Sequence, residues 1–286
     1  MRIYVMTDLE GVAGVRDFQQ WTSPGLPYYD LARSLLTQEL NAAINGLFAG
    51  GATSILVGDG HGPSAVNIVE LDPRVELLRG WGRGWPLGLE EGGFDCIATV
   101  GQHAKSRTEF SNMAHTQGCS YLELSVNGVA IGEFGQFAMC ASELGARAIF
   151  AAGELAFAKE AEALVPGIET VWGKRGTKPG RGDECSEEEY RARNGGAIHF
   201  HPEKVRKMIR DGAERAARRA ANEKFGLIPM KPPYRRVCVL RHSKEKDQPR
   251  RYSIEEHASS FAALMNMPFN FKPVESDAQL KSLLVE

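Results

Sequence analysis

The sequence predicts an α/β fold with a mixed, mostly parallel sheet covered by helices, followed by a smaller C-terminal α/β part. The main observation is that short apolar segments alternate with segments of helical periodicity, and several apolar segments end in glycine-rich loops. In addition, 43% hydrophobic and 24% charged residues over 286 positions are ordinary values for a globular protein. Composition therefore excludes a disordered, collagen-like or disulfide-stapled chain.

The first hundred residues predict three strands and one long helix. The helix covers Tyr28–Ala49, where leucine and alanine recur at helical spacing and Gly50-Gly51 ends the pattern. The strands are short apolar runs bounded by turn residues, and they cover Arg2–Met6, Thr53–Val57 and Phe94–Val100. This strand–helix–strand order is typical of a parallel sheet.

A hairpin follows the third strand. Asn127-Gly128 separates the apolar runs Tyr121–Val126 and Val129–Ile131, and Asn-Gly favours the tight turn of a β-hairpin. Because a hairpin is antiparallel, we expect the sheet to be mixed. The elements expected next are a helix at Phe134–Leu144, a strand at Arg147–Ala151, a helix at Glu154–Leu164 and a strand starting at Thr170–Trp172.

Gly173–Gly196 is rich in glycine and charge, which predicts an exposed excursion with a helix-capping box at Ser186-x-x-Glu189. The helix expected at Pro202–Phe225 has a basic outer face. Acidic residues are interspersed on that face, which favours a solvated surface over nucleic-acid binding.

Pro229, Pro232 and Pro233 indicate a linker that divides the chain into residues 1–228 and 229–286. We expect the second part to be a small subdomain or an oligomerisation element. Its expected elements are a strand at Arg236–Leu240, a helix from the capping box Ser253-x-x-Glu256 to Met265, a strand near Phe271–Pro273 and a last helix from Ser276.

Charge and cysteine usage limit the partners and the compartment. The net charge is −2, from 34 basic and 36 acidic residues, so we expect no nucleic-acid partner and no membrane partner. Leu40–Gly58 is long enough to span a bilayer but contains four glycines, and Asp8 and Glu10 interrupt any export signal at the N-terminus. The five cysteines are odd in number and form no C-x-x-C pair, which favours reduced thiols in the cytoplasm.

Two carboxylates follow the first expected strand. Asp8 and Glu10 are two residues apart, so on an extended segment both side chains point to the same side. Adjacent carboxylates repel unless a cation or a proton lies between them. This pair occurs at the carboxyl end of a strand, where open α/β sheets build their sites, although a solvated loop pair has the same pattern.

Four more residues occupy comparable positions. His61 and His103 follow the second and third expected strands, His115 lies in the next loop, and Glu133 stands between two glycines just before a helix. Each of them alone is more typical of a structural or simply exposed side chain.

Taken together, the residues indicate a metal centre. The carboxyl ends of parallel strands meet at one edge of a sheet, so Asp8, Glu10, His61, His103 and Glu133 are expected to converge there. Carboxylate and imidazole ligands suit Zn²⁺, and less exclusively Mn²⁺ or Co²⁺. Five ligands exceed what one catalytic zinc needs, which favours two ions bridged by one carboxylate. The sequence contains no G-x-G-x-x-G, P-loop, G-x-S-x-G or H-E-x-x-H motif.

These residues lie in blocks that resemble the zinc-dependent D-aminopeptidase family (DppA-type). The resemblance covers about the first 170 residues well and the rest loosely, and its five blocks are specific only in combination. The blocks are DLEGVAG at 8–14, VGDGHG at 57–62, VGQHA at 100–104, MAHT at 113–116 and VNGVAIGEFG at 126–135.

The resemblance implies a dinuclear zinc aminopeptidase that removes an N-terminal residue, a D-amino acid such as D-Ala, from short peptides by means of a metal-bound hydroxide. It implies that Asp8, Glu10, His61, His103 and Glu133 hold two zinc ions, with the aspartate bridging, and that His115 is the catalytic residue. Residues 1–228 would then form the metal-binding catalytic domain. Members of the family form ring-based decamers, so a homo-oligomer is expected.

The sequence departs from the family pattern at residues 181–196, where a charged insertion leaves substrate access and specificity open. How the ligands divide between the ions is open as well; one hypothesis pairs Glu10 with His61 and His103 with Glu133. The alternatives to a peptidase are another dinuclear metallohydrolase, such as a phosphoesterase or an amidase, and a non-catalytic, metal-stabilised oligomeric binding protein.

Overall fold

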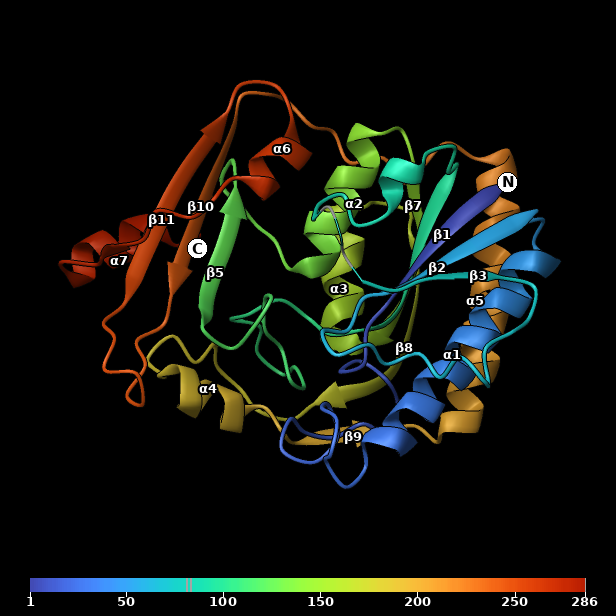
Figure 1. Ribbon diagram of the computed structural model, residues 1–286, viewed down its shortest axis with the longest axis horizontal. Helices are drawn as coiled ribbons and strands as arrows, with labels where there is room; N and C mark the ends of the chain where they lie inside the picture. Colours follow the sequence, from blue (N-terminus) through green and yellow to red (C-terminus); the bar gives the residue numbers. More distant parts are fainter. Residues whose placement is uncertain (81, 83, 286) are drawn as a thin grey trace.

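A computed structural model describes residues 1–80, 82 and 84–285 (Figure 1). Its main feature is a seven-stranded sheet in the order β3-β2-β1-β4-β7-β8-β9. All described neighbours in this sheet pair in parallel except β8 and β9. The strands are β1 (Arg2–Thr7), β2 (Ser54–Asp59), β3 (Glu76–Leu78), β4 (Cys96–Gln102), β7 (Arg147–Glu154), β8 (Glu169–Gly176) and β9 (Ala197–His199).

Helices cover both faces of this sheet. On one face α1 (Tyr29–Ala49) and α5 (Pro202–Asn222) lie side by side, and their apolar stripes form one core with residues such as Ile3 and Val5 of β1. On the other face α2 (Glu133–Glu143) and α3 (Leu155–Leu164) pack against Tyr4 and its neighbours in a second core. The predicted α/β class with a mostly parallel, helix-covered sheet is confirmed.

A second, antiparallel sheet lies beyond α2, so that α2 stands between the two sheets (Figure 1). Its strand order is β12-β11-β10-β5-β6. The hairpin predicted around Asn127-Gly128 is present, but it belongs to this sheet, and the main sheet is mixed through β9 instead. The strands are β5 (Tyr121–Val126), β6 (Val129–Ala130), β10 (Tyr234–Leu240), β11 (Arg251–His257) and β12 (Lys272–Pro273).

The helix predicted from Ser253 to Met265 is wrong in its first half. Residues 251–257 form β11, and the helix α6 (Phe261–Asn266) begins after Ser260, which caps it by accepting from Ala263 N. Ser253 and Glu255 alternate inward on the strand, where Glu255 pairs with the buried Arg236 at 3.0 Å. Ser253 and the exposed Glu256 lie three residues apart and therefore point to opposite faces of the strand, so no capping box forms.

The remaining elements are short. The capping box predicted at Ser186 and Glu189 is confirmed at the start of α4 (Glu187–Arg193), and Ser276 caps α7 (Asp277–Leu283). A 3₁₀ helix, η1, covers Leu89–Glu91. No helix among the described residues is both long and apolar enough to cross a membrane.

The second sheet joins strands from both sides of the predicted linker. The strand β10 pairs with β5 on one side and with β11 on the other, so the C-terminal part shares a sheet with residues 121–130. A division into 1–228 and 229–286 stays a prediction.

Glycines allow the strands to approach one another closely where they end. A Cβ on Gly153 of β7 would lie 1.9 Å from the carbonyl oxygen of Gln102, and a Cβ on Gly101 of β4 would lie 2.0 Å from that of Asp8. Any side chain here would collide with backbone rather than with a movable group. The loops that leave β1, β4 and β7 are therefore held against one another.

This close contact predicts that Gly153→Ala lowers the free energy of unfolding by roughly 1–3 kcal/mol, because the new methyl group must push two strands apart. Urea denaturation measures the loss. Gly118→Ala is the matched control, since a Cβ there meets only Ser120 Oγ at 4.0 Å. Equal stability of the two variants would contradict the explanation.

Candidate metal centre

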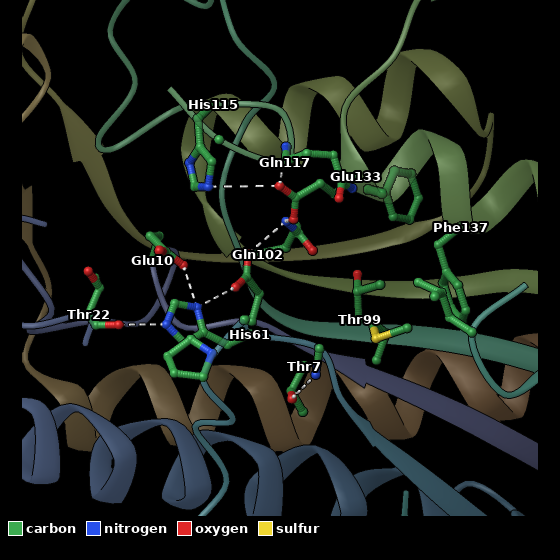
Figure 2. A pocket seen from close by; sticks show the side chains of 18 of the residues that line it. Thr7, Glu10, Thr22, His61, Thr99, Gln102, His115, Gln117, Glu133 and Phe137 are labelled. Carbon is green, nitrogen blue, oxygen red and sulfur yellow. Dashed lines mark hydrogen bonds and ion pairs between the residues drawn. The ribbon is translucent and has the colours of Figure 1, made fainter. Parts of the chain in front are cut away.

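The predicted residues converge at the carboxyl edge of the main sheet (Figure 2). Asp8 and Glu10 follow β1, His61 follows β2 and His103 follows β4, and these three strands are neighbours. Glu133 arrives differently. It is the first residue of α2, and the hairpin that precedes it belongs to the second sheet rather than to the parallel edge.

Asp8 lies at the centre of the cluster. Its Oδ1 is 3.3 Å from His61 Nδ1, and its Oδ2 is 3.1 Å from His103 Nε2. Backbone and side-chain donors fix the carboxylate between the two rings: Leu9 N donates to Oδ1 at 2.8 Å and Gln102 Nε2 donates to Oδ2 at 2.9 Å. Such a carboxylate faces ligands on both sides.

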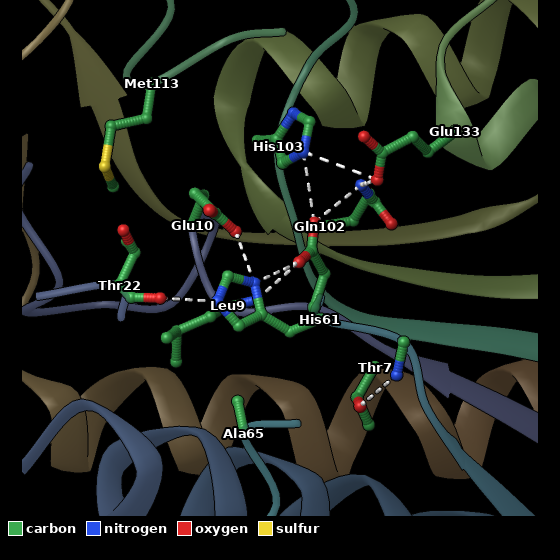
Figure 3. A network of polar contacts seen from close by, with 12 residues as sticks. Thr7, Leu9, Glu10, Thr22, His61, Ala65, Gln102, His103, Met113 and Glu133 are labelled. Carbon is green, nitrogen blue, oxygen red and sulfur yellow. Dashed lines mark hydrogen bonds and ion pairs between the residues drawn. The ribbon is translucent and has the colours of Figure 1, made fainter. Parts of the chain in front are cut away.

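The other two carboxylates flank this centre (Figure 3). Glu10 Oε2 is 3.2 Å from His61 Nδ1, and Glu133 Oε2 is 3.6 Å from His103 Nε2. The second oxygen of Glu133 accepts from Gln117 N at 2.7 Å and lies 3.8 Å from His115 Nε2. His115 therefore belongs to the same cluster, and its ring stacks on that of His103 with centroids 3.8 Å apart.

Each histidine is oriented by a backbone carbonyl. His61 Nε2 contacts Thr22 O at 2.7 Å, His103 Nδ1 contacts Ala104 O at 2.9 Å, and His115 Nδ1 contacts Met113 O at 2.9 Å. A carbonyl oxygen only accepts, so the nitrogen facing it carries the proton. In the neutral ring the other nitrogen then presents a lone pair to the carboxylates, which is the arrangement of metal-ligating histidines.

The cluster strongly attracts positive charge. Burial alone would raise the pKa of the Asp8 carboxyl, but the rings of His103 and His61 outweigh burial and hold that pKa well below its usual range. Burial would lower the pKa of His61, but Glu10 and Asp8 raise it to about 12. The pKa of His103 also lies well above its usual value, because Glu133 and Asp8 outweigh burial. Protons or metal ions can supply this charge.

The donor set fits divalent metal ions. Glu10 Oε2 and His103 Nε2 are buried and form no hydrogen bond within the described part of the chain, although a buried polar atom ordinarily has a partner. Ligand atoms of Asp8, Glu10 and His103 lie within 4.8 Å of one another, and so do those of His103, His115 and Glu133. Two such groups sharing one histidine are compatible with two neighbouring ions.

Sequence reasoning missed the residues that orient this cluster. Gln102 donates to Asp8 and lies 3.5 Å from Glu133 Oε2, so it contacts two of the carboxylates at once. Its position directly before His103 in the block VGQHA is the signal that could have found it.

Two buried charged side chains were missed as well. Lys174 of β8 is fully buried and donates to Glu10 O and to Val15 O, so it fixes the loop after β1. Glu154, at the end of β7, accepts from Ala104 N at 3.2 Å and from Asn112 N at 2.8 Å. Its carboxylate thus ties the His103 segment to the loop that carries His115. A charged residue within or directly after an apolar strand was the available signal.

The cluster lines a cavity of about 450 Å³, a volume in the range of small-molecule sites. Its wall is apolar at Met6, Leu87 and Phe137, and Phe18 packs edge-on against the His115 ring at 5.3 Å. Another part of the wall consists of Gln117–Cys119 together with Arg191 of α4. A short chain molecule could thus contact both apolar and charged groups beside the metal ligands.

Known proteins resemble this chain in sequence and in fold. A D-aminopeptidase of Bacillus subtilis (strain 168) is 30% identical over 175 residues, which cover 60% of this chain and 62% of the relative, less than two thirds of its length. The solved structure of the Zn-dependent D-aminopeptidase DppA from Bacillus subtilis, described as a self-compartmentalizing protease, superposes with a TM-score of 0.69 at 24% identity. The match covers 84% of this chain and 81% of that one. The model of the M55 peptidase family, described as D-aminopeptidase, matches residues 1–259, and the chain therefore belongs to this family.

Proposed function

We propose that the chain is a dinuclear zinc aminopeptidase that releases the N-terminal residue, a D-amino acid such as D-Ala, from short peptides. The observation that carries the proposal is the orientation of the three histidines, each of which has one ring nitrogen on a backbone carbonyl and the other turned toward a carboxylate of the cluster. Membership of the D-aminopeptidase family and the likeness to a zinc-dependent relative support the reaction and the metal.

The five predicted ligands would hold the ions. Asp8 lies between His61 and His103, so its carboxylate would bridge the two ions. Glu10 and His61 complete one site, and His103 and Glu133 complete the other. When bound, two zinc ions lower the pKa of a water molecule towards neutrality and polarise the scissile carbonyl.

His115 would move the proton. Its Nδ1 proton is held by Met113 O, so Nε2 faces the cluster with a free lone pair. Burial lowers the pKa of this ring, which keeps it neutral and able to accept a proton. His115 then takes a proton from the attacking water and returns it to the leaving amine, as a general base and acid. Phe18, edge-on to the ring, limits its rotation.

The apolar part of the cavity would bind a side chain of the substrate. Peptide substrates enter the cavity beside the cluster, where Met6, Leu87 and Phe137 form an apolar surface for a side chain.

We infer a cytoplasmic location, which the five free cysteines support. A ring-based homo-oligomer, of the decameric kind, is part of the proposal, supported by the self-compartmentalizing relative.

The proposed reaction predicts which model substrates the protein hydrolyses. The purified protein should hydrolyse D-Ala-p-nitroanilide and leave p-nitrophenyl phosphate intact, because family and cavity both favour a peptide substrate. Release of p-nitroaniline and of p-nitrophenol is followed by absorbance, with Asp8→Asn as the inactive control. Turnover of the phosphate ester alone would assign the site to a phosphoesterase, and L-Ala-p-nitroanilide measures stereoselectivity.

The proposed dinuclear site predicts the metal content of the protein. Elemental analysis should find about two zinc ions per chain in the protein, as expected for a bridged pair. Asp8→Asn should lose most of both ions, because the bridging position serves both, whereas His61→Ala should lose about one. Circular dichroism checks that the variants fold. A single ion in the unaltered chain would disprove the dinuclear assignment.

A variant of His115 separates a role in catalysis from a role in metal binding. His115→Ala should keep both zinc ions and lose kcat by roughly 10²- to 10⁴-fold, the usual contribution of a general acid–base. His115 also lies within ligand distance of His103 and Glu133, so zinc content must be measured in the same preparation. Loss of one ion would make His115 a ligand, and near-normal turnover would remove it from the reaction.

A further inference from the structure

The helix α4, within the insertion that departs from the family pattern, is firmly attached to the rest of the molecule. Tyr190 is buried, its hydroxyl accepts from Arg107 N at 3.0 Å, and the guanidinium of Arg241 lies 3.6 Å from the centre of its ring. Ser186 caps the first turn. The helix is therefore a rigid support rather than a loose surface loop.

Most charged side chains of α4 have partners. Its three glutamates contact the loop that follows β10, and its last arginine donates to two carbonyl oxygens of the preceding loop. These contacts are Glu187 to Lys246 at 2.7 Å, Glu188 to Ser243 Oγ at 2.5 Å, Glu189 to Lys244 at 2.5 Å, and Arg193 to Pro179 O at 2.5 Å and Gly180 O at 3.0 Å.

Arg191 is the exception. Its side chain is exposed and lines the cavity of the metal centre, and it forms no ion pair or hydrogen bond with the described residues. Within the described lining it is also the only lysine or arginine. A permanent positive charge thus stands in the cavity wall on a rigid helix, without a partner in the part of the chain that the structure describes.

A short loop lies in the same cavity wall as Arg191 and contacts the metal centre. Gln117, Gly118 and Cys119 line the same wall, and Gln117 N donates to the Glu133 carboxylate at 2.7 Å. Burial raises the pKa of the Cys119 thiol to about 11, and the largest charge effect on it comes from Arg191. Arg191 and the cluster therefore act on the same space.

We propose that Arg191 binds a carboxylate of the substrate on the leaving side of the scissile bond, and so selects short peptides that end in a free carboxylate. This inference rests on the proposed aminopeptidase function. One residue spans at most about 3.6 Å, so the terminal carboxylate of a di- or tripeptide lies close to the scissile carbonyl. A guanidinium binds a carboxylate through two parallel hydrogen bonds, which gives both orientation and affinity.

The carboxylate could come from the peptide terminus or from an acidic side chain next to the scissile bond. Three substrates distinguish these sources: D-Ala-D-Ala, its C-terminal amide, and D-Ala-D-Glu amide. The quantity to compare is kcat/KM for each substrate with the unaltered enzyme, with Arg191→Met and with Arg191→Lys. Arg181→Met is the matched control, because Arg181 is an exposed arginine of the same segment that does not line the cavity.

We expect the unaltered enzyme to favour D-Ala-D-Ala over its amide by roughly 10- to 100-fold, the usual effect of a charged hydrogen-bonded pair. Arg191→Met should bring this ratio close to one, Arg191→Lys should keep part of it, and the control Arg181→Met should keep all of it. A preference restricted to D-Ala-D-Glu amide that Arg191→Met also removes assigns the acidic side chain as the source.

Two outcomes overturn the inference in different ways. An acid-to-amide ratio that Arg191→Met leaves unchanged, in a protein that hydrolyses both substrates, refutes the role of Arg191 alone. Failure of the unaltered, zinc-loaded protein to hydrolyse any of the three peptides refutes the proposed function as well. Because zinc content is measured in every variant, a loss of activity through loss of metal is not mistaken for a loss of substrate binding.

Discussion

Three carboxylates that share one buried site repel one another, and the architecture around them depends on relieving that repulsion. Asp8 and Glu10 are almost fully buried, and Glu133 completes the group from α2. Burial removes the water that would screen these charges, so cations or protons must replace it. The three histidines cannot donate with both ring nitrogens while they are neutral. Divalent ions between carboxylate and imidazole would resolve the conflict with the side chains in the positions that they already occupy.

Holding like charges together requires a backbone that cannot relax. The ends of β1, β4 and β7 touch through glycines, and Lys174 and Glu154 fasten the loops that leave them. Burial lowers the pKa of Lys174 and raises that of Glu154, each against the attraction of the other. Hydrogen bonds of these two side chains reach both the Glu10 and the His103 segments. The site is therefore preorganised by backbone contacts that do not depend on the metal ligands themselves.

Much of this could be predicted from local patterns. Strand-end positions brought Asp8, His61 and His103 to one edge, because parallel strands have only one carboxyl edge. Glu133 was predicted by an argument that does not apply to it, since its hairpin lies in the second sheet. The partition into two sheets depends on long-range pairing of β5 with β10, which no local pattern encodes. The first half of the helix predicted from Ser253 is the strand β11, where Ser253 donates to Glu255 and Glu255 accepts from Arg236, a partner about twenty positions away in the sequence that no local pattern reveals.

The second sheet holds the insertion at residues 181–196 in place. Ser243, Lys244 and Lys246 follow β10 and hold the three glutamates of α4, so the C-terminal part fixes the helix that presents Arg191. The proposed metal ligands stand on the main sheet and on α2, and Arg191 stands on a segment anchored to the other sheet. In the proposed enzyme, catalysis and recognition of the carboxylate would therefore depend on different parts of the fold. Because Arg191 forms no ion pair or hydrogen bond with the described residues, we expect a change of charge at this position to alter the proposed preference for a peptide carboxylate while the cluster stays intact.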